Sequence, residues 1–171
     1  LKVSDRVNMR FGPRAVLIPS LLALLVGLLL FARTPVEGGF WVDLAPPMIL
    51  LGLGAGLAFP ALMTLAMSGV EMTEQGLASG LVNTSVQVGG AIGLAVLATL
   101  STDRSESLTA QGEPIAEALN SGYHLAYLVG AALVAVAIVV AIFVLRSQPQ
   151  MAMAEGGAEG EQPEGALAEA A

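Results

Sequence analysis

The sequence contains no cysteine and has few charged or aromatic side chains. Of its 171 residues, 12% are charged and 5% are aromatic, whereas 55% are hydrophobic. The absence of cysteine excludes disulfide bonds and thiolate metal sites, but it identifies no cellular compartment. Ordinary soluble domains carry roughly 25% charged residues, so this chain has too few polar side chains to build a water-soluble surface around a buried core.

Charged side chains are also absent from four long apolar runs that fill most of the chain. About 20 helical residues, at ~1.5 Å each, cross the ~30 Å hydrocarbon layer of a membrane, and each run is close to that length. The runs are almost continuously apolar and do not alternate with period two, which favours helices over the strands of a membrane barrel. We therefore predict an all-α membrane protein with four transmembrane helices. The predicted spans are residues 15–32, 46–68, 80–100 and 125–145.

The first predicted span has the position of a signal peptide but not its pattern. Signal peptides have an apolar region of roughly 7–15 residues that ends at a small-residue cleavage site. The run here is longer and is followed by Arg33, Thr34 and Pro35. Because the chain also begins with Leu1, we predict a true span in a piece of a longer protein.

Basic side chains lie mostly on one side of the predicted spans. They are Lys2, Arg6, Arg10 and Arg14 before the first span and Arg146 after the last, whereas the opposite loops hold Arg33 and Arg104. Positive charge concentrates on the cytoplasmic side of membrane proteins. The pattern therefore predicts both termini in the cytoplasm, with residues 1–14 forming a cytoplasmic loop.

Three further segments lie outside the spans. Phe40 and Trp41, in the first external loop, suit the aromatic belt at a membrane surface. Residues 101–122 are predicted to form a second external loop, with a short surface helix at 113–119. Residues 147–171 are largely Gly, Ala, Glu, Gln and Pro without an aromatic residue. They lack the apolar surface that offsets ordering entropy, so we predict a disordered acidic tail that is solvating or, alternatively, binds a partner.

Small residues mark one face of the second span and one face of the third. Gly52, Gly56 and Pro60 recur every four residues, and such a ridge lets another helix approach closely. Pro60 lacks a backbone N–H and clashes with the carbonyl of Gly56, so we expect a bend. The ridge is interpreted either as rigid packing or as a hinge that moves during transport. Gly89 and Gly93 are predicted to form a second close-packing face.

The third span also carries neutral polar side chains. Asn83 and Gln87 are one helical turn apart, so their amides project from the same face. An amide without a hydrogen bond is unfavourable in hydrocarbon, so this face is not expected to meet lipid. Two interpretations remain open: hydrogen bonds to a partner helix, or, together with Thr84, the lining of a substrate path.

Ionisable groups that could drive transport or catalysis are missing from the predicted spans. None contains Asp, Glu, Lys or Arg, so the acid of any proton-coupled transporter is expected elsewhere. His124, beside Tyr123, is interpreted as an interfacial residue, with a proton-sensing role as the alternative. The sequence shows no nucleophile with a base, no metal-ligand cluster and no phosphate-binding glycine loop. We therefore expect no enzyme activity, cofactor, metal site or nucleic-acid partner.

Two blocks around the second and third spans form a recognisable pattern. Residues 52–60, followed by 74–84 and 87–93, resemble spans near the C-terminal end of major facilitator superfamily transporters. Within that superfamily they are most similar to the fourteen-span drug:proton antiporters of the multidrug efflux group. A degenerate version of the family's cytoplasmic loop motif precedes them. That motif matches Asp5, Arg6, Arg10, Gly12 and Arg14.

The resemblance implies a fold, a function and a set of partners. The chain would form part of the C-terminal bundle of a plasma-membrane transporter that exports hydrophobic or cationic compounds against inward proton flow. Its partners would be the lipid bilayer, the missing N-terminal helices of the same protein, the small-molecule substrate and protons. Alone, it would not transport. The alternatives are a non-transporting four-span scaffold or assembly subunit, a small oligomeric exporter, and an exporter of sugars or metabolites.

Overall fold

A computed structural model describes residues 13–146, which form helices and short connections without a strand. The all-α prediction is therefore confirmed for this part of the chain. The elements are α2 (Pro13–Phe31), the π-helical turn η1 (Phe40–Leu44), α3 (Ala45–Met67), α4 (Gln75–Ala110) and α5 (Ile115–Arg146).

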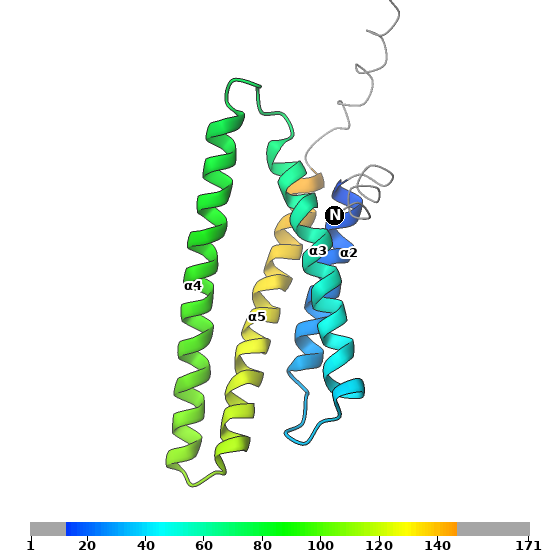
Figure 1. The fold of residues 1–171 in the computed structure, drawn as a ribbon. Coiled ribbons are helices and arrows are strands. Elements are labelled where there is room, and N and C mark those ends of the chain that lie inside the picture. The colour runs from blue at the N-terminus through cyan, green and yellow to red at the C-terminus, as the bar shows by residue number, and fades with distance from the viewer. Residues whose placement is uncertain (1–12, 147–171) are drawn as a thin grey trace, which may run out of the picture.

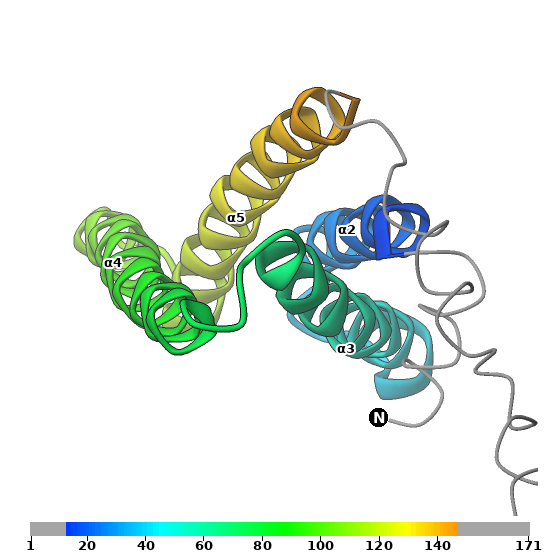
Figure 2. The same cartoon turned by 90° about the horizontal axis from the view of Figure 1, so that it is seen from above.

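The four long helices run alternately up and down (Figure 1). The start of α2, the end of α5 and the connection 68–74 lie at one end of the molecule, which we call the Pro13 end. The connections 32–44 and 111–114 lie at the other end, which we call the Gly112 end. Helix α2 packs against both α3 and α5. Helix α4 packs against α5 at the Gly112 end and diverges from the other helices toward the Pro13 end (Figures 1 and 2).

All four helices are long and apolar enough to cross a membrane. Helices α2 and α3 begin and end within two residues of the predicted spans. Helices α4 and α5 contain the other two spans but are much longer, at 36 and 32 residues.

The prediction of a loop at residues 101–122 is wrong, because most of this segment is helical; its external position stays a prediction. Helix α4 continues through Ala110, and the expected separate helix at 113–119 is instead the beginning of α5. The turn between them is short because Gly112 adopts φ +91°. The N–H of Gly112 then donates to Thr109 O at 3.0 Å, and that of Glu113 to Leu108 O at 3.1 Å. This is the Schellman arrangement that ends helices at a left-handed glycine.

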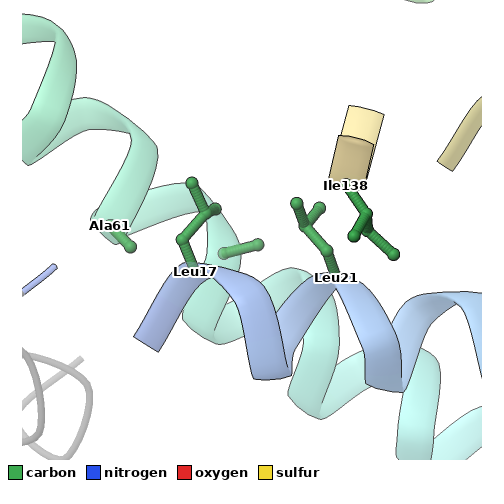
Figure 3. Packing of buried hydrophobic residues seen from close by; sticks show 5 residues of the cluster. Leu17, Leu21, Ala61 and Ile138 are labelled. Atoms are coloured by element: carbon green, nitrogen blue, oxygen red, sulfur yellow. The ribbon is translucent and has the colours of Figure 1, made fainter. Parts of the chain in front are cut away.

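The hydrophobic core of the described residues is small and joins α2, α3 and α5. Leu17 and Leu21 of α2 lie between Ala61 of α3 and Ile138 of α5 (Figure 3). Most other large apolar side chains are exposed. No residue of α4 before Ser101 is buried. A membrane helix of this kind is covered by lipid or by another helix, so α4 has a face on which further helices could pack.

Candidate functional site

The polar side chains predicted to line a substrate path lie on the open part of α4. Asn83, Thr84 and Gln87 are all exposed. Thr84 Oγ1 donates to Gly80 O in its own helix at 2.8 Å, so its hydroxyl is already satisfied. Neither amide forms a hydrogen bond to another residue within 13–146. The two amides are therefore the groups on this face that still require polar partners.

The glycines predicted to pack closely do not contact another helix in the described chain. A Cβ atom added at Gly52, Gly56, Gly89 or Gly93 would meet nothing within 4 Å. Their faces are free to receive helices or lipid, so close packing there stays a prediction. Helix α3 runs through Pro60 without interruption, and Thr64 Oγ1 donates to Pro60 O at 2.9 Å. The choice between a rigid element and a hinge also stays open.

Other glycines provide the close helix contacts, and sequence reasoning missed them. A Cβ at Gly54 would lie 2.8 Å from both Leu24 Cγ and Ser20 O of α2. A Cβ at Gly27 would lie 3.0 Å from Leu51 Cγ of α3. Helices α2 and α3 therefore approach at glycines from both sides. The sequence did show that Gly54 lies between Gly52 and Gly56 and therefore on the opposite face of the same helix, where it could have been recognised as a second contact site.

A third glycine holds α4 and α5 together near the Gly112 end. A Cβ at Gly122 would lie 2.5 Å from Ser101 O and closer still to Ser105 Oγ. Ser105 Oγ donates to Ser101 O at 2.8 Å, so the hydroxyl is satisfied within α4 and leaves room for the backbone of α5. Small residues such as Gly and Ser are typical of close contacts between membrane helices.

A hydrogen-bonded group joins α5 to the segment after α2. His124 Nε2 lies 2.8 Å from Thr34 O, and Asn120 Nδ2 donates to the same oxygen at 3.2 Å. Because a carbonyl oxygen only accepts, Nε2 of His124 carries the hydrogen. One turn further along, the rings of Phe31 and Tyr127 stack with centroids 5.1 Å apart. The side chain of His124, interpreted from the sequence as interfacial, thus has a specific hydrogen-bond partner in Thr34 O.

The remaining predicted features lie at the edges of the described residues or beyond them. Arg14, expected in a cytoplasmic loop, belongs to the first turn of α2 and is half-buried. Asp5, Arg6, Arg10 and Gly12 of the predicted loop motif lie outside the described residues, as does the predicted acidic tail. Phe40 and Trp41 form an edge-to-face pair and are exposed, Trp41 to 82%.

Metal ligands do not cluster in residues 13–146, where no three His, Asp or Glu side chains could hold an ion together. The groups that the structure offers are neutral amides, hydroxyls and close-packing glycines on membrane-length helices. Such groups bind and orient small molecules or other helices. The fold and the open face of α4 thus define an integral membrane protein of the helical-bundle class.

The chain belongs to the Major Facilitator Superfamily, whose family model matches residues 3–168. Members of this superfamily are transporters rather than enzymes. The resemblance found in the sequence is therefore confirmed.

Three curated relatives to which the chain is similar carry names for puromycin resistance, cephamycin export and ammonium transport. Puromycin resistance protein pur8 of Streptomyces alboniger is 36% identical over 102 residues, which are 58% of this chain and 20% of the relative. Cephamycin export protein CmcT of Amycolatopsis lactamdurans is 47% identical over 55 residues, 32% of this chain and 11% of the relative. A low affinity ammonium transporter of Saccharomyces cerevisiae is 31% identical over 90 residues, 53% of this chain and 18% of the relative.

The chain spans about a fifth or less of the length of these relatives. No solved structure matches the chain.

Proposed function

We propose that this chain forms four spans in the C-terminal part of a proton-coupled efflux transporter for small hydrophobic or cationic compounds. Two of the relatives described above are named for puromycin resistance and for cephamycin export, and this chain belongs to a superfamily of transporters. The ammonium transporter among the relatives makes an ammonium-like cation a second substrate class to test.

The observation that carries the proposal is the open face of α4. Asn83 and Gln87 are exposed on a helix with no buried residue before Ser101. In hydrocarbon both amides would lack hydrogen-bond partners, and the transfer of such an amide from water to an alkane costs about 4–8 kcal/mol. Additional spans of the same transporter would cover this helix and enclose the amides beside a polar substrate path. The small matched fraction of the relatives is consistent with such additional spans.

Proton coupling must come from residues outside these spans. Helix α3, residues 75–100 of α4 and residues 125–145 of α5 contain no Asp, Glu, Lys or Arg. Coupling acids in transporters are membrane-embedded ionisable side chains. The chain alone is therefore inactive in this proposal, and the acids belong to the spans that cover α4.

The direct test compares the 171-residue chain with the complete protein that contains it. Each is reconstituted into liposomes with a pH gradient, and the movement of ethidium is followed by fluorescence, with ammonium as the second substrate. We expect gradient-dependent movement by the complete protein and none by the chain. Ethidium transport by the chain alone would contradict the requirement for additional spans.

A non-transporting four-span scaffold or assembly subunit is the second candidate. The open faces at Gly52 with Gly56 and at Gly89 with Gly93 favour it, since a second copy of the chain could pack there. Immunoblotting of native membranes with an antibody against residues 147–171 separates the two candidates. A band several times larger than 17.4 kDa supports the transporter, and a band near 17.4 kDa supports the scaffold.

A further inference from the structure

A groove lies between α4 and α5 on the part of these helices that extends beyond the charge-free spans. It has a volume of about 640 Å³ and is lined by Ser101, Ser105, Glu106, Ile115, Leu119 and Tyr123, among others. Small-molecule sites generally enclose roughly 300–1,000 Å³. The charge-free part of α4 ends at Leu100, and the ten residues 101–110 add about 15 Å of helix. A membrane boundary at the end of the charge-free run would place the groove at the membrane surface, beyond the part of α4 that carries Asn83 and Gln87.

One wall of the groove contains a buried hydroxyl without a hydrogen bond. Ser101 is 9% exposed, and its Oγ forms no hydrogen bond to another residue within 13–146. The neighbouring Ser105, by contrast, donates to Ser101 O. A buried hydroxyl is unfavourable without a partner. Ser101 Oγ lies at the contact with α5, 3.1 Å from the position of a Cβ added at Gly122, and Ser101 also lines the groove. A ligand whose acceptor oxygen reaches this edge of the groove would supply the missing partner.

The groove is lined both by apolar or aromatic side chains and by a carboxylate. Ile115, Leu119 and Tyr123 are 67%, 44% and 53% exposed, so they offer apolar and aromatic surface to a ligand. Glu106 provides the carboxylate among the lining residues. A Tyr ring and a carboxylate together favour a cation that carries an apolar body.

The end of α4 and the beginning of α5 around the groove carry a net negative charge, as Glu106 does. Residues 101–122 contain the carboxylates of Asp103, Glu106, Glu113 and Glu117 against the single guanidinium of Arg104, a net charge of −3. A net negative field attracts cations to a surface site. Only Glu106 of these five residues lines the groove.

We propose that the groove between α4 and α5 binds a small amphipathic amine that also carries an acceptor oxygen. The ammonium group pairs with Glu106, the oxygen accepts a hydrogen bond from Ser101 Oγ, and the apolar body covers Ile115, Leu119 and Tyr123. The site is separate from the proposed transport path, so it does not depend on transport activity.

The test uses propranolol, which combines a naphthyl ring, an ether oxygen and a secondary ammonium group. Its neutral counterpart is 3-(1-naphthyloxy)propane-1,2-diol, which keeps the ring and the oxygens but lacks the amine. The full chain is placed in phosphatidylcholine nanodiscs, and the anisotropy of naphthyl fluorescence is titrated against empty nanodiscs. Because Glu106 is exposed, its ion pair is worth at most about 1 kcal/mol, so we expect saturable propranolol binding about two- to fivefold tighter than that of the diol.

Three variants separate the site from general charge effects. Glu106→Gln should remove the difference between propranolol and the diol, whereas Glu117→Gln makes the same charge change in the hairpin, away from the groove, and should preserve it. Ser101→Ala should weaken both compounds about threefold, because both carry the acceptor oxygen. Equal effects of Glu106→Gln and Glu117→Gln would overturn the proposal, as would binding no stronger than that to empty nanodiscs.

Discussion

Gly122 of α5 lies directly against Ser105 of α4, so closely that no side chain fits at residue 122. A Cβ there would be nearer to Ser105 Oγ than to Ser101 O, from which it would be 2.5 Å away. The second of these neighbours is backbone and cannot rotate away. This contact sets the separation of α4 and α5 at the Gly112 end, and with it the width of the groove.

Substitution of Gly122 should therefore destabilise the α4–α5 contact. Gly122→Ala forces the two helices apart, and overpacking of this kind costs about 1–3 kcal/mol. Gly90→Ala is the matched control, because a Cβ at Gly90 meets nothing within 4 Å. It should be neutral or stabilising by up to ~1 kcal/mol, since alanine favours the helix. Unfolding by SDS titration, followed by circular dichroism, measures both; equal midpoints would contradict the close contact.

Gly54 and Gly52 offer a second matched comparison on α3. A Cβ at Gly54 would lie 2.8 Å from Ser20 O and 2.9 Å from Leu24 N, whereas one at Gly52 meets nothing. Gly54→Ala should lower the free energy of unfolding of the chain by about 1–3 kcal/mol. Gly52→Ala should leave it unchanged or raise it by up to ~1 kcal/mol, as at Gly90.

Transport by the complete protein with Gly52→Ala tests whether the predicted close-packing face at Gly52 meets another span. If Gly52 packs against additional spans, Gly52→Ala lowers transport by the complete protein while the stability of the chain alone is not lowered. Normal transport by Gly52→Ala would remove Gly52 from that face.

The four long apolar helices could be predicted from the sequence, because long charge-free apolar runs favour helices that can cross a membrane. The extension of α4 through Ala110 could not, since residues 101–110 are rich in Ser, Thr and charge. Hydropathy does not distinguish a helix that continues into water from a loop. The combination of Gly112 with Pro114, which confines the turn to four residues, was the signal for a helical hairpin.

The close-packing glycines show a different limit. Regular spacing singled out Gly52 and Gly56, but Gly54 between them contacts α2. Spacing shows which residues share a face of one helix and leaves open which face meets a neighbour. That choice depends on where the other helices lie, and for Gly54 it follows from Ser20 and Leu24 on α2.

The hydrogen bonds to Thr34 O should contribute measurably to stability. His124→Ala and Asn120→Ala each remove one donor, at a cost of about 0.5–1.5 kcal/mol. Because both donors share one acceptor, the double variant should differ from the sum of the single variants. Tyr123→Ala, on a neighbouring and exposed residue, is the control. A strictly additive result would show that the two donors act independently of each other, which would contradict the shared acceptor.

Orientation in the membrane can be measured with single cysteines, because the chain has none of its own. Met72 is 86% exposed at the Pro13 end, and Gln111 is exposed at the Gly112 end. With the Pro13 end in the cytoplasm, as the positive charges predict, a membrane-impermeant maleimide should label Gln111→Cys in intact cells. Met72→Cys should react only after permeabilisation. The unsubstituted chain gives the background, and the reverse labelling pattern would invert the proposed topology.

The amides of α4 allow the two interpretations of its open face to be separated. Asn83→Leu and Gln87→Leu replace each amide by an apolar side chain of similar size. If the amides line a substrate path, ethidium export by the complete protein should fall roughly fivefold or more, since a hydrogen bond of about 1 kcal/mol corresponds to that factor.

The abundance and stability of the leucine variants show why ethidium export falls. If the amides line a substrate path, abundance and stability remain unchanged, because no helix loses a partner. With hydrogen bonds to a partner helix, stability falls together with export. Ser85→Ala is the control on the same helix turn, because its hydroxyl donates to Leu81 O at 2.8 Å within α4. Unchanged export and increased stability in both leucine variants would mean that the amides face lipid, which would contradict the proposed cover over α4.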